Sequence, residues 1–308
     1  MILVLRALGI GDLLTALPAL RALRAALPRD RLVLAAPQYL QPLLTRADCT
    51  DALLPTAHLG ALSWPGPPPD LAVNLHGSGP ESIAALLATG PASILTYAHP
   101  RFPGLEGPAW DQSAHEVDRW CRLLESAGID ADPTRLELAP DPVPTEVPGC
   151  VVVHPGAAAP ARRWPPERFA AVAAYLSEQG YRVVLTGSRD ERPLTDAVAA
   201  LAGLPAAASA GGLHTLDSLV RLVSGARLVV SADTGIGHLA TALGTPSVLL
   251  FGPVSPAQWG PPAGRARHRA LWAGRHGDPR ADSPDPGLLA IDSDQVLDAI
   301  SAQLCPSY

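Results

Sequence analysis

Lysine is absent from this sequence, since all 23 basic residues are arginine. A chain without lysine has neither a Walker A phosphate site nor the Schiff-base lysine of a pyridoxal phosphate enzyme. Charge is scarce as well: charged residues make up 17% of the chain, and the net charge is −6. Proteins that bind nucleic acids need a concentrated basic surface, so we expect no nucleic-acid partner.

Long apolar runs and closely spaced cysteines are also missing. Every apolar run is well short of the roughly 18 residues that indicate a membrane span. Arg6 and Asp12 interrupt the apolar start of the chain, which disfavours a signal peptide. We therefore expect a cytoplasmic protein with at most peripheral membrane contact. The cysteines form no C-x-x-C pair, which favours buried thiols over zinc or disulfides, at Cys49, Cys121, Cys150 and Cys305.

Strand-like and helix-like segments alternate along the chain, which predicts α/β architecture with parallel sheets covered by helices. A length of 308 residues suits two domains. We expect strands at 2–6, 31–35, 71–75, 93–97, 150–154, 182–186, 227–231 and 247–251. We expect helices at 12–26, 80–88, 110–127, 166–178, 191–202, 216–223 and 236–243.

Proline marks the boundary between the two domains. Five prolines crowd into segment 130–149, which suits a linker: Pro133, Pro140, Pro142, Pro144 and Pro148. We therefore place one α/β domain at 1–145 and a second at 149–290. The basic segment after Pro261 is interpreted as a solvated loop or, alternatively, as an acceptor-binding rim. Residues 291–308 form a C-terminal helix that we expect to pack back on the first domain.

A glycine-rich turn follows the first strand, where the chain reads GIGD at 9–12. Leu14 stands where a dinucleotide fingerprint needs a third small residue, which disfavours a dehydrogenase. Asp12 lies at an expected helix start. Its carboxylate is either a helix cap or a general base facing a ligand.

The segment 229–240 is the most informative, because an apolar strand ends in a polar turn that opens a helix. Free amide N–H groups at such a point bind anions. Asp233, Thr234, Gly235 and His238 lie in this turn. The triplet DTG also occurs in aspartic proteases, but those enzymes need two carboxylates in an all-β architecture, and this chain has one triplet.

Two further strand ends carry polar side chains. Arg162 lies in a loop after the strand 150–154, and its guanidinium suits phosphate oxygens, although a surface role is also open. Gly187 and Glu191 follow the strand 182–186. The Glu191 carboxylate either caps the next helix or accepts hydrogen bonds from ribose hydroxyls.

Taken together, these motifs resemble the ADP-heptose:lipopolysaccharide heptosyltransferase family, glycosyltransferase family 9. The resemblance rests on 9–12 with LPAL at 17–20, HPG at 154–156, RWP at 163–165, DTGIGH at 233–238, ALGTP at 242–246 and LFGP at 250–253. It implies the GT-B fold, in which two Rossmann-like domains with parallel sheets face a central cleft. It also implies an inverting mechanism with no metal or other cofactor.

The resemblance assigns roles to the residues above. Asp12 matches the catalytic base. Asp233, Thr234, Gly235 and His238 match the segment that holds the donor diphosphate, and Arg162 stands where relatives often carry lysine. Glu191, with Gly187, matches a ligand of the nucleotide ribose and base. Gly11, His76 and Gly77 lie on the acceptor side, with histidine at 76 where glutamine is common.

The implied reaction is transfer of a heptose from ADP-heptose to an acceptor hydroxyl. No arginine lies between residues 47 and 100, so the basic face expected for a phosphorylated lipopolysaccharide acceptor is lacking. A soluble acceptor such as an aminoglycoside or nucleoside natural product is therefore an alternative to the lipopolysaccharide core. A nucleotide-sugar epimerase, a glycosidic phosphorylase and a binding module without activity are further alternatives on the same fold.

Overall fold

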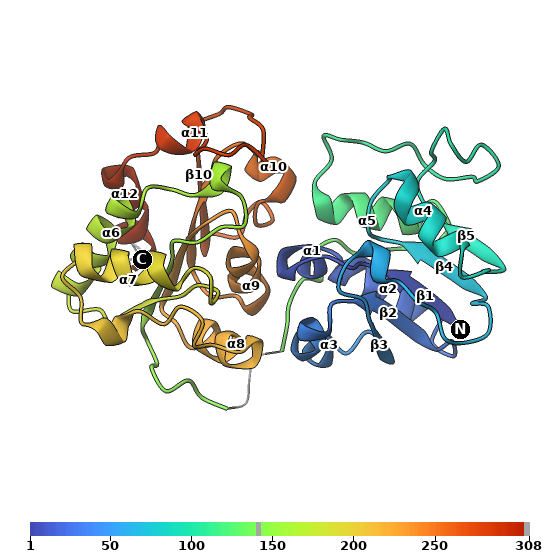
Figure 1. Cartoon of the computed structure of the whole chain (residues 1–308), viewed down its shortest axis with the longest axis horizontal. Coiled ribbons are helices and arrows are strands. Elements are labelled where there is room, and N and C mark those ends of the chain that lie inside the picture. The colour runs from blue at the N-terminus through green and yellow to red at the C-terminus, as the bar shows by residue number, and fades with distance from the viewer. Residues whose placement is uncertain (140–142, 305–308) are drawn as a thin grey trace. The chain divides into compact units, whose positions relative to one another are not determined.

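The computed structural model describes residues 1–139 and 143–304. The chain divides into two compact units, Met1–Leu138 and Ala139–Tyr308. Figure 1 colours the first unit from blue to green and the second from green to red. Pro140 and Pro142 of the expected linker lie outside the described residues, as do Cys305 and the last residues of the expected C-terminal helix.

The first unit is built on a five-stranded parallel sheet with the strand order β3-β2-β1-β4-β5. Its strands are β1 (Ile2–Leu5), β2 (Leu32–Ala36), β3 (Ala52–Pro55), β4 (Leu71–Asn74) and β5 (Ser93–Leu95). Its α-helices are α1 (Ile10–Thr15), α2 (Leu17–Ala26), α3 (Gln41–Ala47), α4 (Pro80–Leu87) and α5 (Glu116–Glu125), and short 3-10 turns cover Gln38–Leu40 and Leu59–Ala61.

The central strand β1 determines where the functional loops of this unit lie. Its four residues are all buried, as a strand covered on both faces requires. It pairs with β2 on one side and β4 on the other, so the direction of winding reverses between β1 and β4. Loops that follow the carboxyl ends of such neighbouring strands are the usual ligand-binding loops of open α/β sheets. Asp12 lies in the first turn of α1, directly after the loop that follows β1, and His76 lies in the loop that follows β4.

The helix expected at 12–26 is in fact two helices, α1 and α2, which meet at Ala16. Pro18 is the physical reason, because it lacks an N–H group and its ring clashes with the carbonyl four residues earlier. Pro18 therefore occupies the first turn of a new helix. Because α1 begins at Ile10 with Gly9 as its N-cap, Asp12 is the third helical residue and not the N-cap. Its carboxylate nevertheless caps the helix, because it accepts a hydrogen bond from the Gly9 amide in a capping box.

The second unit contains another five-stranded parallel sheet, with the order β10-β9-β8-β6-β7. Its strands are β6 (Val151–His154), β7 (Val183–Leu185), β8 (Leu228–Ala232), β9 (Ser247–Phe251) and β10 (His268–Trp272). Its described helices are α6 (Pro166–Glu178), α7 (Arg192–Leu201), α8 (Leu216–Ser224), α9 (Gly235–Leu243), α10 (Pro256–Trp259), α11 (Pro286–Leu289) and α12 (Ser293–Leu304), with 3-10 turns at Pro160–Arg162 and Ala206–Ala208.

Strand β10 contradicts the interpretation of the basic segment as a continuous loop. It pairs with β9 in parallel from His268 to Trp272 and forms one edge of the sheet. Two of its five side chains are exposed and three are partly buried, so the strand has no apolar run that the sequence could reveal. Strand β3 and helix α3 of the first unit were missed as well.

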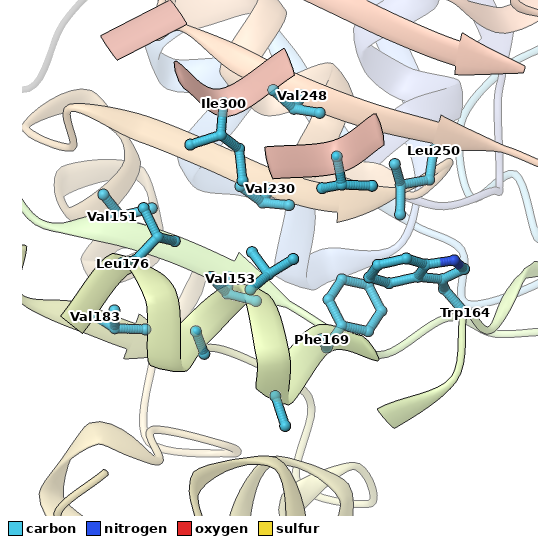
Figure 2. Close-up of a cluster of buried hydrophobic side chains, with 14 of the residues drawn as sticks. Val151, Val153, Trp164, Phe169, Leu176, Val183, Val230, Val248, Leu250 and Ile300 are labelled. Atoms are coloured by element: carbon cyan, nitrogen blue, oxygen red, sulfur yellow. The ribbon is translucent and has the colours of Figure 1, made fainter. Parts of the chain in front are cut away.

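The core of the second unit gathers side chains from the sheet and from both ends of the unit's sequence (Figure 2). Trp164 packs edge-on against Phe169 with ring centroids 5.0 Å apart, and its indole donates to the Ile291 carbonyl. Fully burying one such aromatic side chain contributes about 1.5–3 kcal/mol. Val296 and Ile300 of α12 belong to this same core. The helix thus contributes to the core of the second unit, and its packing back on the first domain stays a prediction.

Two expectations about the chain concern thiols and membranes. The structure confirms the expected buried free thiols at Cys49, Cys121 and Cys150. Burial raises the pKa of Cys121 to about 12 and that of Cys49 to about 11, so these thiols stay protonated and unreactive. Within the described ranges, no helix combines the length and the apolar character that crossing a bilayer requires.

Candidate functional site

The start of helix α9 in the second unit presents an unsatisfied hydroxyl group. Strand β8 ends at Ala232, and Thr234 is the N-cap of α9 with extended backbone angles. The Thr234 side chain makes no capping hydrogen bond, and its buried Oγ1 has no partner among the described residues. Gly235 is the first helical residue, so the free amide groups of the first turn follow directly.

Arg162 lies beside this turn. Its Nη1 is 4.0 Å from Asp233 Oδ2 and 3.5 Å from the Asp233 carbonyl oxygen, so the pairing is loose. The Arg162 Nε is buried and finds no partner within the described part of the chain. The guanidinium therefore keeps hydrogen-bonding capacity next to the unsatisfied Thr234 hydroxyl. Unsatisfied buried polar groups are unusual in a folded protein, and these two, one at the start of α9 and one on the arginine that contacts Asp233, indicate a polar ligand.

His238 lies one turn into α9 and faces the same cluster. Its Nε2 is 3.9 Å from Asp233 Oδ1, and its ring meets Trp259 edge-on with centroids 5.9 Å apart. These side chains, with Thr234 and Thr241, line a small cavity of about 10 Å³, which is the space of about one water molecule. The structure thus brings together the predicted donor residues Arg162, Asp233, Thr234 and His238.

Glu191 and Gly187 lie together in the same unit, between β7 and α7. The Glu191 carboxylate does not bond the first turn of α7 and instead accepts a hydrogen bond of 2.7 Å from the Ser188 amide. Gly187 and Gly156 leave room for this side chain: a Cβ atom added at Gly156 would lie 2.2 Å from Glu191 Oε1, and one added at Gly187 would lie 3.0 Å from Glu191 Cβ. The carboxylate can therefore occupy this position only because residues 156 and 187 have no side chain.

A larger cavity of the second unit lies elsewhere. It measures about 610 Å³ and runs between segment 143–147, strand β7 and the start of α8. Leu213 and His214 line one part of it, and Arg182 lines another. None of the predicted donor residues lines this cavity.

In the first unit, Asp12 is held at the start of α1 with part of its carboxylate open to solvent. Its Oδ2 accepts a hydrogen bond of 3.1 Å from the Gly9 amide, and Oδ1 lies 3.6 Å from Arg6 Nη2. The side chain is 30% exposed. Because one oxygen is anchored and the group is not enclosed, the carboxylate is both oriented and accessible, as a general base requires.

The other residues predicted for the acceptor side also lie in the first unit. Gly11 is the residue before Asp12 in α1, and Gly77 follows His76 after β4. The His76 Nδ1 is buried without a partner among the described residues. Burial lowers the pKa of His76, and the positive charge of Arg6 lowers it further while Asp12 raises it. The imidazole is therefore neutral at pH 7, with a ring nitrogen available for a hydrogen bond.

Sequence reasoning missed Arg6 and Tyr39 as neighbours of Asp12. Arg6 ends the predicted first strand, and charge at a strand end ordinarily indicates solvent, yet this side chain is 1% exposed. Tyr39 follows β2 and is 53% exposed. The buried part of this side chain raises the pKa of the phenol, and the negative charge of Asp12 adds to that rise. An aromatic residue just after a strand was the only signal for it.

Comparison with known proteins identifies the family of the chain. The model of glycosyltransferase family 9 (heptosyltransferase) matches residues 109–283, more than half of the 308 residues. Lipopolysaccharide heptosyltransferase 2 of Escherichia coli K12 is 32% identical over 151 residues, which cover 47% of this chain and 43% of that relative. The chain thus aligns with less than half of the length of this curated relative.

Solved structures of other proteins share the fold of nearly the whole chain. A family 9 glycosyl transferase from Veillonella parvula has a TM-score of 0.79 at 21% identity and covers 99% of this chain and 97% of its own. The E. coli ADP-heptose lps heptosyltransferase II has a TM-score of 0.77 at 24% identity and covers 98% of each chain. These likenesses, with the two parallel sheets, confirm the predicted GT-B fold of two Rossmann-like domains. The chain belongs to glycosyltransferase family 9, the heptosyltransferase family.

Proposed function

We propose that this protein is an inverting glycosyltransferase that moves a heptose from ADP-heptose to an acceptor hydroxyl without a metal ion. The related E. coli enzyme is named an ADP-heptose heptosyltransferase, which supports this donor. The observation that carries the proposal is a pair of buried, unsatisfied groups, Thr234 Oγ1 at the start of α9 and Nε of Arg162, whose Nη1 reaches the preceding residue Asp233. Both groups donate hydrogen bonds, as a diphosphate requires of its site.

The donor side of the reaction concentrates negative charge on the leaving group. When the bond between the anomeric carbon and the β-phosphate oxygen breaks, ADP leaves with additional negative charge. The Arg162 guanidinium, the Thr234 hydroxyl and the amide groups at the start of α9 would stabilise that charge. Preorganised donors of this kind usually supply the largest single contribution to catalysis. They also allow the reaction to proceed without a metal ion.

The acceptor side needs a base. The acceptor oxygen forms the new bond to the anomeric carbon on the face opposite to the leaving group, and its proton passes to Asp12. The Asp12 side chain is 30% exposed, and its Oδ1, which lies 3.6 Å from Arg6 Nη2, is the oxygen that would accept this proton. Positioned proton transfer of this kind contributes about 10²–10⁴ in rate. Single displacement inverts the anomeric configuration.

For the acceptor we propose a lipopolysaccharide core precursor, because the related E. coli protein is a lipopolysaccharide heptosyltransferase. His76, with its buried unpartnered Nδ1, would meet a hydroxyl group of that acceptor. The cytoplasmic location stays a prediction.

The proposal is tested by incubating the full chain in excess EDTA with ADP-heptose, ADP-glucose, UDP-glucose or GDP-mannose. Each reaction receives either a heptose-deficient lipopolysaccharide core or an aminoglycoside, and mass spectrometry follows free nucleotide and product. We expect ADP release only with ADP-heptose and the lipopolysaccharide core, with an inverted anomeric centre in the product. A changed sugar nucleotide without any acceptor would indicate an epimerase. Activity that EDTA abolishes, or no ADP release with any acceptor, would contradict the proposal.

A further inference from the structure

A buried network of charges lies behind Asp12 in the first unit. Arg6, Glu116 and Arg119 are 1%, 4% and 6% exposed. Arg6 Nη2 donates to Glu116 Oε1 at 2.9 Å, and Arg119 pairs with the other oxygen of the same carboxylate. Trp120 covers the network: its indole donates to Glu116 Oε1 at 2.9 Å, and its ring lies 4.6 Å from the Arg6 guanidinium carbon.

The charges of this network balance only when Asp12 is included. Arg119 pairs with Glu116 at close range and also donates to the backbone carbonyl of Ala114. The positive charge of Arg6 is then matched by Asp12, whose Oδ1 lies 3.6 Å from Arg6 Nη2. Burying an unpaired charge is costly, so the exposed carboxylate and the buried guanidinium hold each other in place.

Arg6 also fixes the backbone on which Asp12 and His76 are carried. Its Nε donates to the Asp12 carbonyl at 2.9 Å, and Nη2 lies 3.3 Å from Thr15 Oγ1. Nη1 donates to the carbonyl of Leu75, the residue before His76. Only the planar fork of an arginine reaches three chain segments at once, since lysine presents its donors from one point.

We infer that Arg6 is a positioning residue for the Asp12 base, which it orients through the backbone of α1 and through the carboxylate itself. This inference rests on the proposed function. Arg6 lies beneath the base and turns the carboxylate toward the acceptor hydroxyl. Glu116 stabilises the network without touching Asp12, so its role is structural.

The test compares Arg6→Lys, Glu116→Gln and Asp12→Asn, together with the double variant of Arg6→Lys and Asp12→Asn. Initial rates with ADP-heptose and acceptor give kcat and the donor KM, and thermal melting shows that each variant is folded. For Arg6→Lys we expect kcat to fall by about 10- to 100-fold, as a base misplaced by about 1 Å would give. The donor KM should stay within about twofold, because the donor residues lie in the other unit.

Two comparisons separate positioning from a merely structural role. In the Asp12→Asn background, Arg6→Lys should change the residual kcat by less than about twofold, because the carboxylate that it orients is gone. Glu116→Gln, an equally buried change in the same network, should lower the melting temperature and leave kcat within about threefold. The inference would be overturned if Arg6→Lys lowered kcat equally in both backgrounds. It would also be overturned if Glu116→Gln lowered kcat as much as Arg6→Lys does in the wild-type background.

A milder variant covers the case in which Arg6→Lys does not fold. Thr15→Val removes one contact of Arg6, together with the hydrogen bond of 3.0 Å from the Thr15 hydroxyl to the Asp12 carbonyl, and leaves the buried cation in place. It should lower kcat several-fold in the wild-type background and not in the Asp12→Asn background; equal losses in both would overturn the inference. Asp12→Asn with full activity would remove the proposed base and this inference together, whereas an impaired Asp12→Asn with additive Arg6 effects would remove the inference alone.

Discussion

Replacing Thr234 with valine separates ligand binding from stability more cleanly than any other single change in the second unit. The Thr234 hydroxyl is buried, makes no capping bond and has no partner among the described residues. Valine has nearly the same shape without the polar group. Because an unsatisfied buried hydroxyl costs about 1–3 kcal/mol, Thr234→Val should stabilise the free protein. At about 2–4 °C per kcal/mol for a unit of this size, the melting temperature should rise by several degrees.

The same substitution should weaken donor binding. A hydrogen bond to a charged phosphate is worth about 1.5–3 kcal/mol. Its loss predicts that the Kd for ADP rises about 10- to 150-fold. Calorimetric titration with ADP gives the Kd, and thermal melting with and without saturating ADP gives the two stabilities. We thus expect two changes of opposite sign. The melting temperature of the ADP-free protein should rise, and the further rise caused by saturating ADP should become smaller.

Thr241 on the same helix supplies the matched control. Its hydroxyl is also buried but donates to the Gly237 carbonyl at 3.0 Å. Thr241→Val should therefore lower the melting temperature and leave the Kd for ADP within about twofold. Unchanged ADP affinity in Thr234→Val, or an equal loss of affinity in Thr241→Val, would refute the assignment of the Thr234 hydroxyl to the diphosphate.

Three further predictions concern Asp12, the Glu191 carboxylate and the pH dependence of the free energy of unfolding. Asp12→Asn should lower kcat by about 10²–10⁴ with an unchanged Kd for ADP, and a large loss of ADP binding in titrations would refute the base role. Gly156→Ala places a Cβ atom 2.2 Å from Glu191 Oε1 and should displace that carboxylate. Gly156→Ala, Glu191→Ala and the double variant should therefore raise the Kd for ADP alike, by about 5- to 30-fold; additive losses would argue against a shared cause. Burial and nearby arginines lower the pKa of His268 to about 4, below its ordinary 6.5. The unfolded chain therefore binds the proton first, and the free energy of unfolding should fall as pH drops from about 6.5 to about 4, by at most about 1.4 kcal/mol per pH unit. Urea unfolding of His268→Gln should show a weaker dependence in this range, and an unchanged slope would contradict the assignment.

The clustering of the predicted donor residues at the start of α9 could be predicted because its signal is local. An apolar strand, a polar turn and a helix start follow one another within residues 228–243, so the chain order alone brings Asp233, Thr234 and His238 to one place. Glu191 and Gly187 are equally close in sequence. The Arg162 position came from the family resemblance, since nothing local shows that it reaches a turn 71 residues away.

The environment of Asp12 was not predictable in the same way. Arg6 and Glu116 are 110 positions apart, and either side chain taken alone indicates a solvated surface. Only the packing of α5 against the first sheet's loops buries them together. Strand β10 was missed for a related reason: an edge strand with exposed arginine and partly buried neighbours has no apolar pattern, and its pairing with β9 supplies the order.

The most direct test of the central claim is a crystal structure of the full chain with ADP bound. The account predicts that the β-phosphate lies within hydrogen-bond distance of Thr234 Oγ1 and Arg162 Nε, with the ribose at Glu191. ADP bound away from the start of α9, for example wholly within the 610 Å³ cavity beside Leu213 and His214, would contradict it.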